Sequence, residues 1–236
     1  MSVLTGDRQA AVIRPRRRLP DSPRWSPASA LAETTGTYDA DSVYLAARQW
    51  EADFGAYLDA FVRLIPEGSH LIVDAGCGAG RDVAAFVARG FSCVGVDLSA
   101  GMLARARARV TDPCATWLQA DIRAIPFETA SAGGVWTNAA LLHLDSDGQL
   151  AAFREFRRLL LPGAPLFVTT LAGSGWSSRH TGTGLRRWFW GTDVVGLSKL
   201  LSSLGFHIVS AKGEAGLVQG EWVNVLALAP RSGRGL

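Results

Sequence analysis

The stretch Val73–Asp82, VDAGCGAGRD, decides the fold of this chain. It overlaps an apolar run, residues 70–74, which predicts a buried strand. Alternate positions then hold glycine, at Gly76, Gly78 and Gly80. Glycines permit a sharp turn and let backbone N–H groups come close to a ligand, because no Cβ intervenes. The stretch therefore predicts a strand and a ligand-binding turn of an α/β sheet.

Beyond this unit the chain alternates short apolar runs with helical patterns. Further strands are predicted at residues 91–98, 116–120, 134–138, 166–171, 207–211 and 222–229, and helices at 82–88, 102–110, 149–161 and 194–204. Only residues 212–221 separate the last two strands, which is too short for a parallel return. We therefore expect an α/β fold with a doubly wound, mostly parallel seven-stranded sheet that ends in an antiparallel C-terminal hairpin.

The N-terminal region differs in composition from the rest. Residues 1–35 contain four prolines, a run of arginines and no apolar period, and they predict a disordered basic tail. A transit peptide, or a tail that contacts nucleic acid or anionic lipid, stays open as an alternative. Order is expected near Asp41, followed by a helix with one apolar face: Trp50, Phe54, Tyr57, Phe61 and Leu64. The 236 residues then comprise this tail, one domain over residues 36–230 and a short tail over residues 231–236.

The net charge of +3 is carried by the two ends of the chain. Residues 1–24 hold six arginines and two aspartates, and residues 231–236 add two arginines. Subtracting the +4 and +2 of these ends leaves −3 for residues 25–230. A nucleic-acid binder usually presents a strongly basic face, so the charge of the body argues against that class.

Composition excludes several other classes. Hydrophobic residues make up 48% of the chain, yet no apolar run reaches the roughly 18 residues that span a bilayer. No secretory signal pattern is found at the start. The three separated cysteines predict neither a disulfide framework nor a metal site: Cys77, Cys93 and Cys114. We expect a cytoplasmic protein in a reducing setting.

Acidic residues end three of the predicted strands. The first strand ends at Asp74, before the glycines, the second ends at Asp97, and Asp121 follows the third. In an open α/β sheet, ligands bind outside the carboxyl ends of the strands. Asp97, 19 residues after Gly78, can accept hydrogen bonds from both ribose hydroxyls, and Asp121 can accept from the amine of adenine. The pattern predicts a nucleoside-shaped ligand.

Two residues decide between nucleoside ligands. A dinucleotide site requires G-x-G-x-x-G, but the third glycine position holds Arg81, which disfavours a dinucleotide oxidoreductase. Asp74 would lie unfavourably near a pyrophosphate, whereas a ligand with an amino group and a sulfonium tolerates a carboxylate. These features favour S-adenosylmethionine.

Four stretches carry a family resemblance: VDAGCGAGRD (73–82), GVDLS (95–99), QADIRAIPF (119–127) and VWTNAALLHLD (135–145). They resemble the successive motifs of class I S-adenosylmethionine-dependent methyltransferases, and they are most similar to the broad small-molecule, type 11-like group. The resemblance covers roughly residues 38–229. Ala164 stands where a second glycine commonly follows Pro-Gly, and the N-terminal tail has no counterpart in the family.

The resemblance implies S-adenosyl-L-methionine as cofactor and a role for each matching position. Asp97 takes the ribose hydroxyls, and Asn138 lies where the methyl group meets its acceptor. The remaining residues implied in cofactor binding belong to the glycine turn or flank the ribose and adenine: Asp74, Gly76, Cys77, Gly78, Gly80, Arg81, Leu98, Met102, Asp121 and Ile122.

Acceptor residues are expected outside the sheet. His143 is the candidate general base, with a structural histidine in a turn as the alternative. Two polar–aromatic segments, residues 38–44 and 176–190, could close over a small organic acceptor through Tyr38, Tyr44, Arg179, Arg187, Trp188 and Trp190. The alternative is that the tryptophans pack the core while the arginines are solvated.

The sequence thus predicts a methyltransferase that acts on a small molecule by in-line transfer, without a metal. Two alternatives stay open: an RNA methyltransferase that uses the basic tail as a tether, and a non-catalytic cofactor-binding partner subunit. The acceptor atom and the oligomeric state are not predicted.

Overall fold

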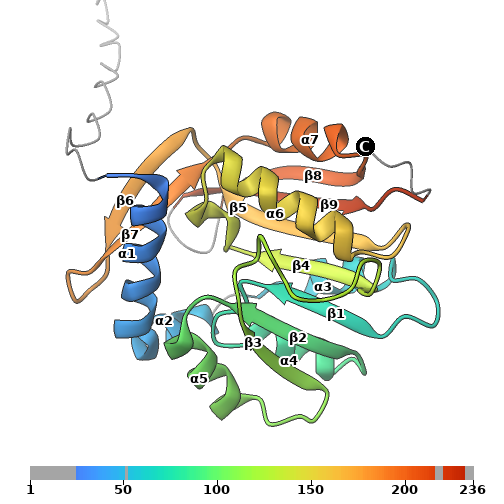
Figure 1. Cartoon of the computed structure of the whole chain (residues 1–236), viewed down its shortest axis with the longest axis horizontal. Coiled ribbons are helices and arrows are strands. Elements are labelled where there is room, and N and C mark those ends of the chain that lie inside the picture. Colours follow the sequence, from blue (N-terminus) through green and yellow to red (C-terminus); the bar gives the residue numbers. More distant parts are fainter. Residues whose placement is uncertain (1–24, 51–52, 216–219, 232–236) are drawn as a thin grey trace, which may run out of the picture.

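The computed structural model describes residues 25–50, 53–215 and 220–231. Their main sheet has seven strands in the order β3-β2-β1-β4-β5-β9-β8 (Figure 1). The strands are β1 (Leu71–Ala75), β2 (Ser92–Asp97), β3 (Ala115–Gln119), β4 (Gly134–Asn138), β5 (Pro165–Leu171), β8 (His207–Ala215) and β9 (Glu221–Leu228). Strands β1 to β5 run parallel, and β9 is antiparallel to both β5 and β8. The predicted mostly parallel sheet with its C-terminal hairpin is confirmed.

Helices cover both faces of this sheet. The helices of the described chain are α1 (Pro27–Ala40), α2 (Ser42–Gln49), α3 (Gly55–Val62), α4 (Arg81–Val87), α5 (Ala100–Arg109), α6 (Ser146–Leu159) and α7 (Val194–Ser203), with a 3₁₀ turn at Leu141–His143. Helices α6 and α7 lie over one face, and α3 and α4 lie over the other (Figure 1). Successive side chains of a strand point to opposite faces, so each buried strand supplies both cores.

Alternate residues of strand β4 belong to the two hydrophobic cores, one on each face of the sheet. Val135 packs in the core beneath α6 and α7, whereas the next residue, Trp136, packs in the core beneath α3 and α4. The Trp136 ring stacks on Phe167 at 4.0 Å and meets Phe61 and Phe86 edge-on. Because the central strands are buried on both faces, the sheet is rigid where its carboxyl ends form the site.

A second, two-stranded sheet lies outside the main one. Strands β6 (Gly175–His180) and β7 (Arg186–Gly191) form an antiparallel hairpin, and α1 packs against β7 (Figure 1). Two hydrogen bonds fix this contact: the Thr37 hydroxyl donates to the carbonyl of Arg186 at 2.6 Å, and the Trp188 N–H donates to the Thr34 hydroxyl at 2.9 Å.

Two expectations need correction at the N-terminal side. The disordered tail was expected to reach residue 35, but Ser26 caps α1, so residues 25–35 belong to the folded body; residues 1–24 lie outside the described residues. The single helix expected from Trp50 to Leu64 is wrong as well, because α2 ends at Gln49 and α3 begins at Gly55. At the other end, residues 232–236 of the predicted tail also lie outside the described part.

In the described part of the chain, no helix combines the length and the apolar character that a membrane span requires.

Candidate functional site

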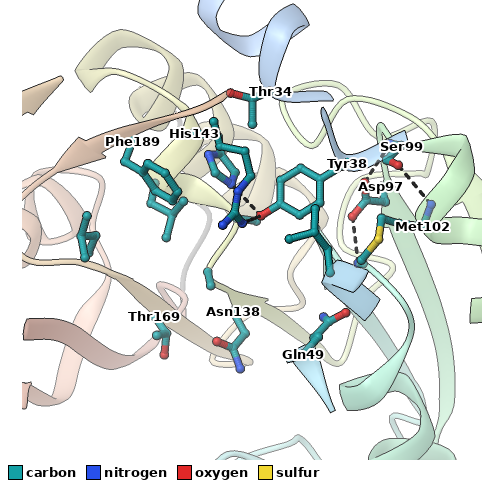
Figure 2. Close-up of a pocket in the computed structure, with 18 of the residues that line it drawn as sticks. Thr34, Tyr38, Gln49, Asp97, Ser99, Met102, Asn138, His143, Thr169 and Phe189 are labelled. Carbon is teal, nitrogen blue, oxygen red and sulfur yellow. Dashed lines mark hydrogen bonds between the residues drawn. The ribbon is translucent and has the colours of Figure 1, made fainter. Parts of the chain in front are cut away.

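A cavity of about 880 Å³ opens at the carboxyl ends of the parallel strands and extends beneath α1, α2 and β7. In Figure 2, Asp97, Ser99 and Met102 lie on one side of it, His143 and Phe189 on the other, and Tyr38 between them. Thirteen of the residues singled out from the sequence line it: Tyr38, Gly76, Gly78, Arg81, Asp97, Leu98, Met102, Asp121, Ile122, Asn138, His143, Arg179 and Arg187. The topology therefore brings most of the predicted site together.

Asp97 joins the glycine turn to α5. Its two carboxylate oxygens accept from the N–H groups of Gly78 and Ser99, each at 2.8 Å. Burial raises the pKa of this carboxyl, although both backbone bonds counteract the shift. The Ser99 hydroxyl in turn caps α5 and donates to Asp39 at 2.6 Å. Asp97 thus presents a fixed carboxylate to the cavity.

Gln49, at the end of α2, forms hydrogen bonds with the backbone of the glycine turn. Its side-chain amide donates to the carbonyl of Cys77 at 3.2 Å and accepts from the N–H of Ala79 at 2.8 Å. A Cβ on Gly78 would come within 2.6 Å of the Gln49 Oε1 atom, and Gly78 has a φ of +54°, so the position requires glycine. Gln49 also lines the cavity, a role that its sequence position gave no signal for.

Asp82, which follows the glycine turn, is the shared hydrogen-bond acceptor of several neighbouring side chains. It accepts two hydrogen bonds from Arg81, one from the Trp136 indole at 2.8 Å and one from the Asn138 amide at 3.0 Å. Asn138 and Arg81, both predicted cofactor residues, are therefore held by a carboxylate that sequence reasoning missed. Asp74 is buried beside this group and does not line the cavity; burial, and next the charge of Asp82, raises the pKa of Asp74 well above its ordinary value.

Asp121 and Ile122 form the wall at the end of β3. The Asp121 carboxylate accepts from the Arg123 guanidinium and backbone, with a shortest distance of 2.6 Å. Burial would raise the pKa of Asp121, but the bonds from Arg123 outweigh it and hold that pKa below its usual range. Ile122 is buried next to it and gives the wall an apolar surface.

A chain of hydrogen bonds lies at the other end of the cavity. The carbonyl of Trp188 is 2.6 Å from Nδ1 of His143, so Nδ1 carries the proton and Nε2 is the acceptor. The Tyr38 hydroxyl lies 3.1 Å from that Nε2 and also accepts from Arg187 at 3.1 Å (Figure 2). Burial, helped by the charge of Arg187, lowers the pKa of His143 to about 4. His143 is therefore a neutral proton acceptor that faces Tyr38.

A second polar group lines the wall formed by β5, β8 and β9. The Thr169 hydroxyl donates to Asn224 at 2.7 Å, and the Asn224 amide donates to Glu214 at 3.5 Å. Burial, with Glu214 contributing, raises the pKa of Tyr57 to about 12. All four residues line the cavity. None was predicted as a site residue, because α3, β5 and the β8–β9 hairpin, which lie far apart in sequence, bring them together.

Several predicted residues lie elsewhere. Among the expected acceptor residues, Tyr44 is exposed on α2, and Trp188 and Trp190 point to the face of β7 opposite Arg187, where they contact Trp25 and Trp176, respectively. The remaining two belong to the glycine turn. Cys77 is buried, which raises the pKa of its thiol, and a Cβ on Gly80 would meet the Trp117 ring at 2.5 Å. None of these five residues lines the cavity.

Within the described residues, no three His, Cys, Asp or Glu side chains are grouped as they would be around a metal ion.

Comparison with known proteins agrees with this geometry. Residues 72–163, from β1 to the turn after α6, match the family model described as a methyltransferase domain. The chain therefore carries a methyltransferase domain at residues 72–163. The match covers the glycine turn, Asp97, Asp121 and Asn138, and it ends before the β6–β7 hairpin.

Curated relatives with methyltransferase names align over about half of the chain. A malonyl-[acyl-carrier protein] O-methyltransferase from Enterobacter lignolyticus is 41% identical over 101 residues, which cover 43% of this chain and 39% of that protein. An uncharacterized methyltransferase from Mycobacterium bovis is 33% identical over 123 residues, covering 51% and 60%. The chain therefore spans less than two thirds of the length of these relatives.

A solved structure extends the likeness in fold to most of the chain. The 1,6-didemethyltoxoflavin-N1-methyltransferase of Burkholderia thailandensis, with its ligand and S-adenosylhomocysteine bound, superposes with a TM-score of 0.64 at 19% identity. The superposition covers 89% of this chain and 93% of that one. It shows that the methyltransferase fold includes the elements around the domain core.

Proposed function

We propose that this protein transfers a methyl group from S-adenosylmethionine to a small-molecule acceptor. One observation carries the proposal: a single cavity of about 880 Å³ connects the Asp97 carboxylate with the Tyr38–His143 pair. Pockets for drug-sized ligands measure roughly 300–1,000 Å³, so this one has room for a nucleoside and a compact second molecule. Relatives named for O- and N1-methylation support the reaction class without fixing the acceptor atom.

The residues of the cavity fit the proposed cofactor. Asp97 supplies the carboxylate that two ribose hydroxyls require, and Leu98, Met102 and Ile122 supply an apolar slot for adenine. At the turn, the Gly76 and Gly78 backbone faces the cavity without a Cβ. S-adenosylmethionine, when bound, supplies a methyl group already activated by its positive sulfur. The protein then has to align the acceptor in line with that methyl and keep water out.

Tyr38 and His143 provide the path for a proton. An acceptor hydroxyl or amine can donate its proton to the Tyr38 oxygen while the Tyr38 hydroxyl proton passes to Nε2 of His143, 3.1 Å away. The acceptor then forms its bond to the methyl carbon, and the bond from that carbon to sulfur breaks. In this scheme Tyr38 touches the acceptor, and His143 is a positioning residue that acts through it.

Titration calorimetry with S-adenosylhomocysteine, followed by an assay for its formation from S-adenosylmethionine and a panel of small acceptors, tests the proposal. We expect binding of the cofactor product and turnover with at least one small acceptor. Failure to bind S-adenosylhomocysteine would refute the cofactor assignment. Binding without turnover on any small acceptor would instead support a non-catalytic partner subunit.

A further inference from the structure

Arg187 is a cation in the cavity wall that forms no ion pair, although its charge helps hydrogen bonds from Thr181 and Thr183 to lower the pKa of the Asp41 carboxyl. Within the described residues, no carboxylate oxygen lies within 4.0 Å of its guanidinium. Nη1 donates to the Tyr38 hydroxyl, whereas Nε is buried and makes no hydrogen bond. A buried donor is costly when it has no hydrogen-bond partner. The wall at Arg187 therefore favours an anionic ligand.

A second cation lies directly across the hairpin. Arg179 pairs with Arg187 in the β6–β7 register, so both side chains lie on the face of the hairpin that lines the cavity. Their guanidinium carbons lie 5.2 and 5.3 Å from the centre of the Phe189 ring. Like charges directly opposite each other destabilise a strand pair, and the ring face offsets part of that cost. An anion at this face would be attracted by both side chains.

The other charges that line the cavity favour an anion at the face of the hairpin that carries Arg179 and Arg187. Arg81 is paired with Asp82, so its charge is compensated. The Asp97 and Asp121 carboxylates lie at the proposed cofactor end, and Glu214 lies on the wall of Tyr57 and Asn224. Each of these carboxylates would repel an anion placed near it.

We propose that the methyl acceptor carries a carboxylate and that Arg187, with Arg179 beside it, binds this group. The inference rests on the proposed function, since it assigns the class of acceptor for the same cavity. A carboxylate fits because a guanidinium binds its two oxygens with parallel hydrogen bonds. Leu142, Leu171, Phe189 and Trp222 line the adjoining surface and suit an apolar carbon skeleton. The substrate class is a small carboxylic acid with an apolar body.

Matched pairs of ligands test the carboxylate against its neutral isostere. The complex with S-adenosylhomocysteine is titrated with benzoate and benzamide, and with hexanoate and hexanamide. We expect each carboxylate to bind at least about tenfold more tightly than its amide, since hydrogen bonds between charged groups are the strong ones. Arg187→Gln should abolish that preference, and Arg187→Lys should keep part of it.

Arg186→Gln is the matched control, because Arg186 is the next residue of β7 and faces Glu33, 3.7 Å away, outside the cavity. It should retain the preference for carboxylates.

The proposal is wrong if neither carboxylate binds, if carboxylate and amide bind equally, or if Arg187→Gln binds benzoate as the wild type does. These outcomes are separate from the proposed function, because binding of S-adenosylhomocysteine to the wild type is measured first. If that binding is intact, only the class of acceptor is refuted.

Discussion

At the scale of single residues, Asp97 has the most direct expected effect. Asp97→Ala removes the carboxylate that we assign to the ribose hydroxyls and also frees the N–H of Gly78. Hydrogen bonds to charged groups contribute roughly 1.5–3 kcal/mol, so we expect the affinity for S-adenosylhomocysteine to fall about ten- to hundredfold. Calorimetry measures this, with Asp59→Asn as a control, because Asp59 pairs with Arg89 on the surface. Equal affinities in the Asp97 variant and the wild type would contradict the assignment.

Tyr38 is the residue whose loss should affect turnover and leave cofactor binding intact. Tyr38→Phe keeps the ring between Arg187 and His143 but removes the hydroxyl that joins them. General acid–base groups contribute roughly 10²–10⁴-fold, so we expect kcat to fall about a hundredfold with an acceptor that must lose a proton. Tyr44→Phe, on the exposed side of α2, is the control. A normal kcat in Tyr38→Phe would exclude the proposed proton path.

His143 should make the fold sensitive to acid. Its pKa is lowered to about 4 in the folded protein, from about 6.5 in an unfolded chain, so the unfolded state binds the proton more readily between these values. Stability is therefore present above pH 6.5 and is lost as pH falls toward 4. Between pH 7 and pH 5 this amounts to about 2 kcal/mol. Measured by urea unfolding, the free energy of unfolding of His143→Gln should fall by about 2 kcal/mol less than that of the wild type between pH 7 and pH 5. An identical fall in both proteins would contradict the burial of a neutral imidazole.

Residues that meet their partners within a local motif could be predicted, and residues with distant partners could not. Asp97 and Ile122 follow strands at the edge where parallel strands bind ligands, so their place at the cavity could be read from the pattern. Gln49 contacts the glycine turn 30 residues away, and Asp82 holds Asn138 across 56 residues. No local spacing encodes such contacts, which arise only when the chain folds.

At the scale of elements, the same distinction separates the main sheet from α1 and the hairpin. The strands were predicted because apolar runs and turn residues mark them. Helix α1 contains ALAETTGTYDA, which has no apolar stripe, and its threonines bind β7 instead. The segment after β5, where no strand was predicted, forms a strand pair. The alternation of its side chains explains why Arg187 and Phe189 line the cavity while Trp188 does not.

The contact between α1 and β7 gives a prediction at this scale. Thr34→Val removes the oxygen that accepts from the buried N–H of Trp188. A buried donor without a partner costs about 1–3 kcal/mol, so thermal unfolding should shift to lower temperature by several degrees. Thr35→Val is the matched control, because the Thr35 hydroxyl donates only to the Leu31 carbonyl of its own helix. Equal melting temperatures for the two variants would show that α1 is not fixed by this bond.

At the scale of the whole molecule, the described body carries its site on a rigid sheet and closes it with elements from both ends of the chain. The cofactor half comes from β1 to β4, within the matched methyltransferase domain. Apart from His143 and Leu142, the acceptor half comes from α1, the β6–β7 hairpin and the β8–β9 hairpin, outside that match. The two arginines of the proposed acceptor class, Arg179 and Arg187, therefore lie outside the residues that the family model covers.

The arginine-rich residues 1–24 distinguish the small-molecule function from its RNA alternative. A chain that begins at Trp25 keeps the ring contacts of Trp25 with Trp176 and Trp188 and the Ser26 cap of α1. We expect the chain that begins at Trp25 to match the full chain in its affinity for S-adenosylhomocysteine, its melting temperature and its turnover of a small acceptor. A chain that begins at residue 36 loses most of α1 and should be less stable. It shows what a truncation that damages the fold looks like in the same assays. If the full chain methylates RNA and the chain from Trp25 does not, residues 1–24 act as a tether for RNA. That result would contradict the small-molecule assignment, because a cavity that binds a compact carboxylic acid does not require a basic segment.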